Sequence, residues 1–193
     1  MSVKPIKIVV TLLIMLVLAS AAGIALMWPA LTIHDAPSTS LEYRQLAHLN
    51  SFTQNHVQVD INLEQSQSGQ TYVSATYKPL DATFHLYSKD LPPNGIDGVG
   101  RPTLLEVRKG AQPAGSVTDS VPAKDTKIDG FDVPFPIYPD GPVTLRLPIK
   151  AIEGGSAPMQ LSLTYMACSL TGGCYPPVMD KTVTVSGITA NNP

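Results

Sequence analysis

The chain has 193 residues, of which 18 are proline and 14 glycine, and only 15% are charged. This length suits one domain with an appended segment, and the composition favours a loop-rich all-β protein over a helical one. The formal net charge of −2 comes with no basic stripe, which excludes a nucleic-acid-binding protein, because that class needs clustered Lys and Arg.

The N-terminal segment is long and apolar. Residues 8–28 carry no charge, and as a helix they would span roughly 30 Å, the thickness of a bilayer core. Lys4 and Lys7 precede this run, so the positive-inside rule keeps the N-terminus in the cytoplasm. We therefore expect residues 1–33 to be an uncleaved membrane anchor. The alternative is a signal sequence cleaved near Ala19-Ser20-Ala21.

Residues 34–54 are expected to be a linker. Thr39 and Glu42 have the spacing of a capping box, and the leucines that follow could form a loose apolar stripe, which allows a short helix over residues 40–50. These leucines are Leu41, Leu46 and Leu49. An irregular tether is the alternative interpretation.

From Val57 onward the pattern alternates with period two, as in half-buried strands, and Gly-containing turn signals separate the runs. Eight or nine short strands at this spacing predict an antiparallel β-sandwich over residues 55–190. The expected strands are residues 57–63, 71–77, 82–87, 103–107, 117–119, 131–135, 143–147, 159–166 and 181–186.

Both cysteines of the chain lie near its end, Cys168 and Cys174, with five residues between them. The run before Cys168 alternates like a strand, so the two thiols should meet at the tip of a β structure. One interpretation is a structural disulfide, the usual fate of two cysteines outside the cytosol. The other is a redox-active dithiol. A bridge across so short a loop constrains the unfolded chain by only ~2 kcal/mol, which favours the redox interpretation.

The stretches Tyr165–Cys168 and Cys174–Pro177 carry a resemblance. They are similar to the active-site hairpin of the periplasmic N-terminal domain of the thiol:disulfide interchange protein DsbD, whose pattern is roughly Tyr-Gln-Gly-Cys, five residues, then Cys-Tyr-Pro-Pro. The second half matches fully, whereas Met166 and Ala167 depart from the first. The resemblance covers roughly residues 55–187 and implies an immunoglobulin-like fold.

The resemblance also implies roles for residues of the hairpin. Cys174 would form the mixed disulfide with a partner protein, and Cys168 would resolve it. The two tyrosines would flank the pair, with core packing as the alternative role, and the two prolines would hold Cys174 at the edge of the sheet. These four residues are Tyr165, Tyr175, Pro176 and Pro177.

The segment 91–102 lies about where the family has a cap loop that covers the cysteines. The family's cap loop carries an aromatic residue, but this segment offers only Ile96 and Val99 among glycines. A plain Gly/Pro connection is the alternative. If the segment is a cap, Asp97 is the acidic residue expected nearest the thiols, where it would disfavour the thiolate. The alternative for Asp97 is a solvated aspartate in a turn.

These expectations together describe a thiol–disulfide interchange module, a protein-disulfide reductase component that needs no cofactor or metal. The resemblance implies a bacterial protein that spans the inner membrane once, with its folded domain in the periplasm. The expected donors are a membrane-embedded electron transporter and a thioredoxin-like protein, and the acceptor is an oxidised periplasmic protein. The alternatives are an adaptor with an inert disulfide and a Cu(I)-binding protein that uses Met159, Met166 and Met179.

Overall fold

The computed structural model describes residues 42–152 and 157–186, so the predicted anchor at residues 1–33 lies outside the described part. Every regular element in these two ranges is a β-strand. Among these residues there is accordingly no helix long and apolar enough to cross a membrane.

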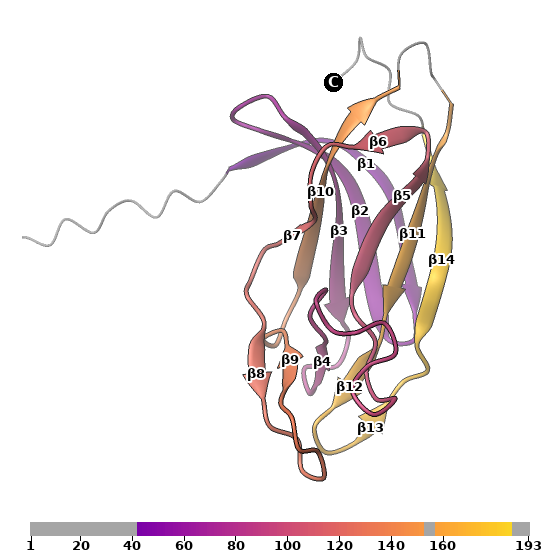
Figure 1. Cartoon of the computed structure of the whole chain (residues 1–193). Coiled ribbons are helices and arrows are strands. Elements are labelled where there is room, and N and C mark those ends of the chain that lie inside the picture. The colour runs from indigo at the N-terminus through magenta and orange to yellow at the C-terminus, as the bar shows by residue number, and fades with distance from the viewer. Residues whose placement is uncertain (1–41, 153–156, 187–193) are drawn as a thin grey trace, which may run out of the picture. The chain divides into compact units, whose positions relative to one another are not determined.

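Two antiparallel sheets make up most of the described fold (Figure 1). The first has the order β1-β2-β3-β10, with two short strands also paired to β10, and the second has the order β14-β11-β5. The first sheet consists of β1 (Tyr43–Gln54), β2 (Val57–Ser66), β3 (Thr71–Pro79), β10 (Val143–Ala151), β6 (Ala111–Pro113) and β7 (Thr118–Asp119). The second consists of β14 (Val178–Val185), β11 (Met159–Tyr165) and β5 (Leu104–Lys109).

The remaining strands gather at one end of these sheets, at the bottom of Figure 1. They form a small sheet of order β13-β12-β4 and a separate β8-β9 hairpin. Their bounds are β13 (Gly173–Cys174), β12 (Ala167–Ser169), β4 (Phe84–Leu86), β8 (Lys124–Thr126) and β9 (Phe135–Ile137). The small sheet holds both cysteines and therefore positions the candidate site.

Alternating side chains fill the space between the two main sheets. In β2 and β10 every second residue is buried, as period-two patterning requires of strands with one buried face. Their apolar side chains join those of β11 and β14 in one core cluster. The expected all-β antiparallel sandwich is confirmed.

The helix expected over residues 40–50 is wrong, because β1 begins at Tyr43 and pairs with β2 along its length. The pairing shifts between Gln45 and Ala47 and again between His48 and Asn50. Each such bulge breaks the period-two alternation. Leu46, Leu49 and Phe52, all packed against the core, therefore recur every three residues and imitate a helical stripe.

The strand expected over residues 131–135 is displaced. Pairing with β8 starts only at Phe135 and continues to Ile137, so Phe131 lies in the β8–β9 loop. This displacement matters for the site, because the position of the Phe131 ring is set by the loop and not by strand pairing.

Candidate functional site

The two cysteines face each other across the hairpin of β12 and β13. Cys168 is the register partner of Cys174, their Cα atoms are 4.0 Å apart and their sulfurs are bonded. Next to the disulfide, the Tyr175 amide donates to the Ala167 carbonyl at 3.0 Å. Directly opposed residues of antiparallel strands project to the same face, so strand pairing alone brings the thiols together.

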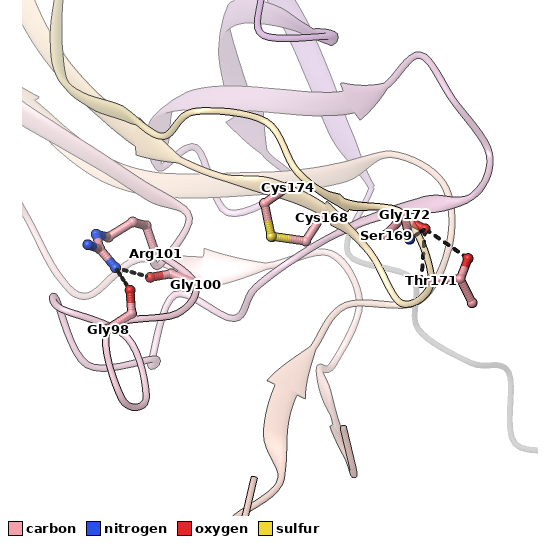
Figure 2. The surroundings of a disulfide bond; sticks show 8 residues. All are labelled: Gly98, Gly100, Arg101, Cys168, Ser169, Thr171, Gly172 and Cys174. Carbon is pink, nitrogen blue, oxygen red and sulfur yellow. Dashed lines mark hydrogen bonds between the residues drawn. A yellow bond between two sulfur atoms is a disulfide. The ribbon is translucent and has the colours of Figure 1, made fainter. Parts of the chain in front are cut away.

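The turn of this hairpin is closed by Ser169. Its Oγ accepts hydrogen bonds from the backbone amides of Thr171, at 3.2 Å, and Gly172, at 3.1 Å (Figure 2). A hydroxyl that satisfies backbone donors in this way fixes a local turn. The hairpin is thus held by hydrogen bonds as well as by the disulfide, and we expect the cysteines to remain opposed after reduction.

The cysteines differ sharply in exposure. Cys168 is 1% exposed, whereas Cys174 is an exposed residue on the edge strand β13. Thiol–disulfide exchange requires a thiolate to reach a sulfur atom. A partner can therefore approach Cys174, and Cys168 can reach only Cys174.

The small sheet separates two groups of side chains. Leu86 and Ala167 project from one face into the main core, whereas Tyr87 and Cys168 project from the other face into a second cluster. This division follows from the alternation of side chains along β4 and β12. Only residues that project to the same face as Cys168 can lie beside the disulfide.

Tyr165 lies on the core side and not beside the cysteines. Its ring meets the ring of Tyr77 edge-on with centroids 5.5 Å apart, and its hydroxyl donates to the Gln54 carbonyl at 3.1 Å. Burial raises the pKa of Tyr165 above its ordinary value. Of the two roles weighed for this tyrosine, the structure supports core packing.

Tyr175 also packs on the core side. Its ring stacks on His56 at a centroid distance of 4.2 Å and contacts Phe84 at 4.8 Å. Because side chains alternate along the strand, the ring that follows Cys174 points away from the face of the disulfide. Tyr175 thus supports the backbone of the hairpin rather than covering its sulfurs.

The two prolines are exposed, and the chain there is tied to the β1–β2 turn. Asn55 Nδ2 donates to the Pro176 carbonyl at 2.7 Å. Asn55 and His56 both have positive φ, 49° and 57°, as a two-residue type I′ hairpin turn requires. This turn holds the Tyr-Pro-Pro corner, a long-range contact that could not be predicted from the sequence alone.

Aromatic side chains cover Cys168 from elsewhere in the chain. The cluster of Cys168 contains Tyr87 and Phe135, whose ring centroids are 5.8 Å apart. Phe131 packs against this cluster and meets Phe135 edge-on at 4.9 Å. Burial raises the pKa of Tyr87 to about 12. The aromatic side chains near Cys168 are thus Tyr87, which directly follows β4, Phe135 at the start of β9 and Phe131 in the β8–β9 loop.

Part of the predicted cap segment also reaches the Cys168 cluster. Ile96 and Val99 pack against it and exchange backbone hydrogen bonds of 3.0 and 2.9 Å. Between them Asp97 and Gly98 form a turn with φ values of 49° and 82°, the type I′ geometry for which Asp-Gly is suited. Asp97 is exposed at the tip of this turn, and its effect on the thiols stays a prediction.

Arg101 fixes the shape of this segment. Its guanidinium donates to the Asn94 carbonyl at 3.0 Å. It also donates to the carbonyls of Gly98, at 2.9 Å, and Gly100 (Figure 2). A loop whose carbonyls converge on one guanidinium is preorganised. The segment is thus an ordered loop that packs on the cluster, and its role as a cap stays a prediction.

The three methionines considered for copper lie in different surroundings. Met159 is buried in the main core, Met166 packs against the Cys168 cluster and Met179 is half exposed. Soft-metal sites need their sulfur ligands to converge. The described structure gives the Cu(I) alternative no support.

Comparison with known families agrees with this geometry. A family model described as the N-terminal part of the thiol:disulfide interchange protein DsbD matches residues 50–186, well over half of the chain. The chain belongs to this family. An opposed pair of cysteines on the small sheet fits thiol–disulfide interchange, the chemistry for which the DsbD family is named.

Among solved structures, the chain is similar to the crystal structure of the Neisseria meningitidis DsbD N-terminal domain in its reduced form. It is 24% identical to this chain, the match covers 60% of this chain and 76% of that one, and the TM-score is 0.41. No curated protein matches the chain.

We predict that Phe131→Ala exposes Cys168. With the ring gone, alkylation of Cys168 in the reduced protein should rise about tenfold relative to that of Cys174, because thiol reactivity follows access. Mass spectrometry after a short treatment with iodoacetamide measures this ratio. Val133, 48% exposed in the same loop, provides the matched control, since Val133→Ala should leave the ratio unchanged. An unaltered ratio in Phe131→Ala would mean that the ring does not cover Cys168.

Proposed function

We propose that this DsbD N-terminal domain relays reducing equivalents to oxidised envelope proteins through the Cys168/Cys174 pair. The single observation that carries the proposal is the asymmetry of that pair. Cys174, which is exposed on an edge strand, is bonded to Cys168, which is buried directly opposite it. An inert structural bridge has no need of this arrangement, whereas exchange depends on it.

The relay proceeds in two attacks. In the reduced domain the Cys174 thiolate attacks a client disulfide, forms a mixed disulfide and releases one client thiolate. The Cys168 thiolate then attacks the sulfur of Cys174 and releases the second client thiolate. The client gains two electrons and two protons, and the domain is left with the Cys168–Cys174 disulfide.

Recharging is the same chemistry in reverse. A donor dithiol attacks Cys174, because Cys168 is buried beneath the aromatic cluster. We propose a thioredoxin-like protein served by a membrane-embedded electron transporter as this donor. The apolar run of residues 8–28 supports a single-pass anchor in the bacterial inner membrane, with the sandwich in the periplasm.

The equilibrium reduction potential of the Cys168–Cys174 couple tests the proposal. The protein is equilibrated in graded dithiothreitol buffers, the thiols are trapped with a maleimide and the two forms are separated by mass. A relay should be poised above about −300 mV, near its exchange partners, whereas a structural disulfide lies below that value. A potential below this limit would favour the adaptor with an inert bridge.

A further inference from the structure

His85 occupies a position on the small sheet that the relay as described does not use. It lies on β4, and its register partner on β12 is Cys168, which is in turn the partner of Cys174 on β13. Directly opposed residues of antiparallel strands project to one face, with Cβ atoms about 4.5–5.5 Å apart. Cys174, Cys168 and His85 therefore form one row across three strands.

The imidazole of His85 is buried and incompletely paired. The residue is 4% exposed, and among the described residues its Nε2 has no hydrogen-bond partner. A buried polar atom without a partner is costly and calls for an explanation. In this oxidised state the sulfurs of the disulfide have no proton to donate, but a reduced Cys168 would offer an S–H group beside the imidazole.

The surroundings favour the neutral imidazole. Burial lowers the pKa of His85, and the Asp140 carboxylate, near the start of β10, raises it by a smaller amount. Tyr87, whose ring meets His85 edge-on at 5.2 Å, is a further ionisable neighbour, and so is the Cys168 thiol after reduction. A neutral imidazole has one ring nitrogen free to accept a proton.

We propose that His85 accepts the proton of Cys168 when the mixed disulfide on Cys174 is resolved, an inference that rests on the proposed function. The Cys168 S–H bond breaks and its proton passes to the imidazole. The Cys168 thiolate forms the new S–S bond with Cys174, and the bond between Cys174 and the client breaks. The client sulfur leaves as a thiolate, and the proton on His85 returns to it or to water.

The need for an acceptor follows from burial. Only the thiolate attacks a disulfide, and burial in an apolar cluster disfavours it. Cys168 lies at 1% exposure among Tyr87, Phe135 and Leu91, so water has little access to its proton. His85 is the basic side chain paired directly with it in the sheet.

The reduced protein can be tested with dithiobis(nitrobenzoate), an aromatic disulfide that releases a coloured thiolate at each step. The first release reports attack by Cys174, and the second reports resolution by Cys168. In His85→Asn the second release should be about 100-fold slower at neutral pH, as for loss of general-base help. The deficit should shrink as the pH rises, because hydroxide increasingly removes the proton of Cys168 in place of the imidazole. The first release should be unchanged.

The variant His85→Gln should behave like His85→Asn, because an amide can hydrogen-bond a thiol but cannot take its proton. His48→Asn removes an exposed histidine of β1 and should leave both releases as in the wild type. A second release that is unaltered, or that is slowed equally at every pH, would overturn the role of His85. Failure of the first release in the wild type would instead overturn the proposed function, and this inference with it.

Discussion

Replacing Cys168 with alanine should convert the domain into a trap that holds a disulfide-bonded partner on Cys174. Cys174 is exposed and still able to attack, but the sulfur that would release the partner is gone. Incubation with oxidised glutathione should leave one glutathione on Cys174 of Cys168→Ala for at least about 100 times longer than on the wild type. The lost group is an intramolecular nucleophile of high effective concentration. Intact-mass spectrometry of quenched samples measures the adduct.

The converse substitution, in which Cys174 and not Cys168 is replaced, provides the control. Cys174→Ala retains only the buried thiol, so it should acquire little or no glutathione over the same time, because Cys168 is screened by the aromatic cluster. Equal adduct formation on the two variants would contradict the assignment of Cys174 as the attacking residue. A wild-type adduct as durable as that of Cys168→Ala would show that Cys168 does not resolve it.

Tyr165→Ala should destabilise the domain by about 4 kcal/mol, the cost typical of removing a large buried ring. The ring is 1% exposed and packs against Tyr77 in the main core. Tyr165→Phe keeps the ring and removes only the hydrogen bond to the Gln54 carbonyl, so it should cost about 1 kcal/mol. Urea unfolding followed by circular dichroism measures both losses.

The variant Tyr165→Phe also separates a core role of this tyrosine from a role at the thiols. Because Tyr165 belongs to the main core cluster and Cys168 to the second cluster, Tyr165→Phe should leave the alkylation rates of both cysteines unchanged. Tyr175→Ala is the comparison, since its half-buried ring supports the strand that carries Cys174 and should cost less stability than Tyr165→Ala. A change in thiol reactivity without loss of stability in Tyr165→Phe would restore the flanking role.

The main sheets could be predicted from the sequence because their alternation is uninterrupted. Val57, Val59, Ile61 and Leu63 are buried in turn along β2, as the period-two pattern requires. The β1 strand could not be predicted in this way, since its two bulges give an apolar spacing that suits a helix equally well. Bulges depend on the partner strand, and the sequence of one strand alone does not reveal them.

The cysteine pair was likewise accessible from the sequence, through its spacing and the Tyr-Pro-Pro motif. The aromatic cover of the pair was not accessible, because Phe135 shares a cluster with Cys168, and Phe131 packs against that cluster, from a part of the chain distant in sequence. The alternation of side chains along a strand could have predicted that Tyr175 and Cys174 project to opposite faces of the sheet. The same rule could not identify His85, whose importance follows from the pairing of β4 with β12.

The redox state of Cys168 and Cys174 in growing cells tests the central claim most directly. Cultures are quenched in acid, free thiols are alkylated with a heavy maleimide and the full chain is resolved by mass. The relay account predicts that part of the protein is reduced, and that this part shrinks when a disulfide-generating oxidant is added. A chain that is fully oxidised under every condition, and that keeps its biological activity when both cysteines are replaced by serine, would contradict the account.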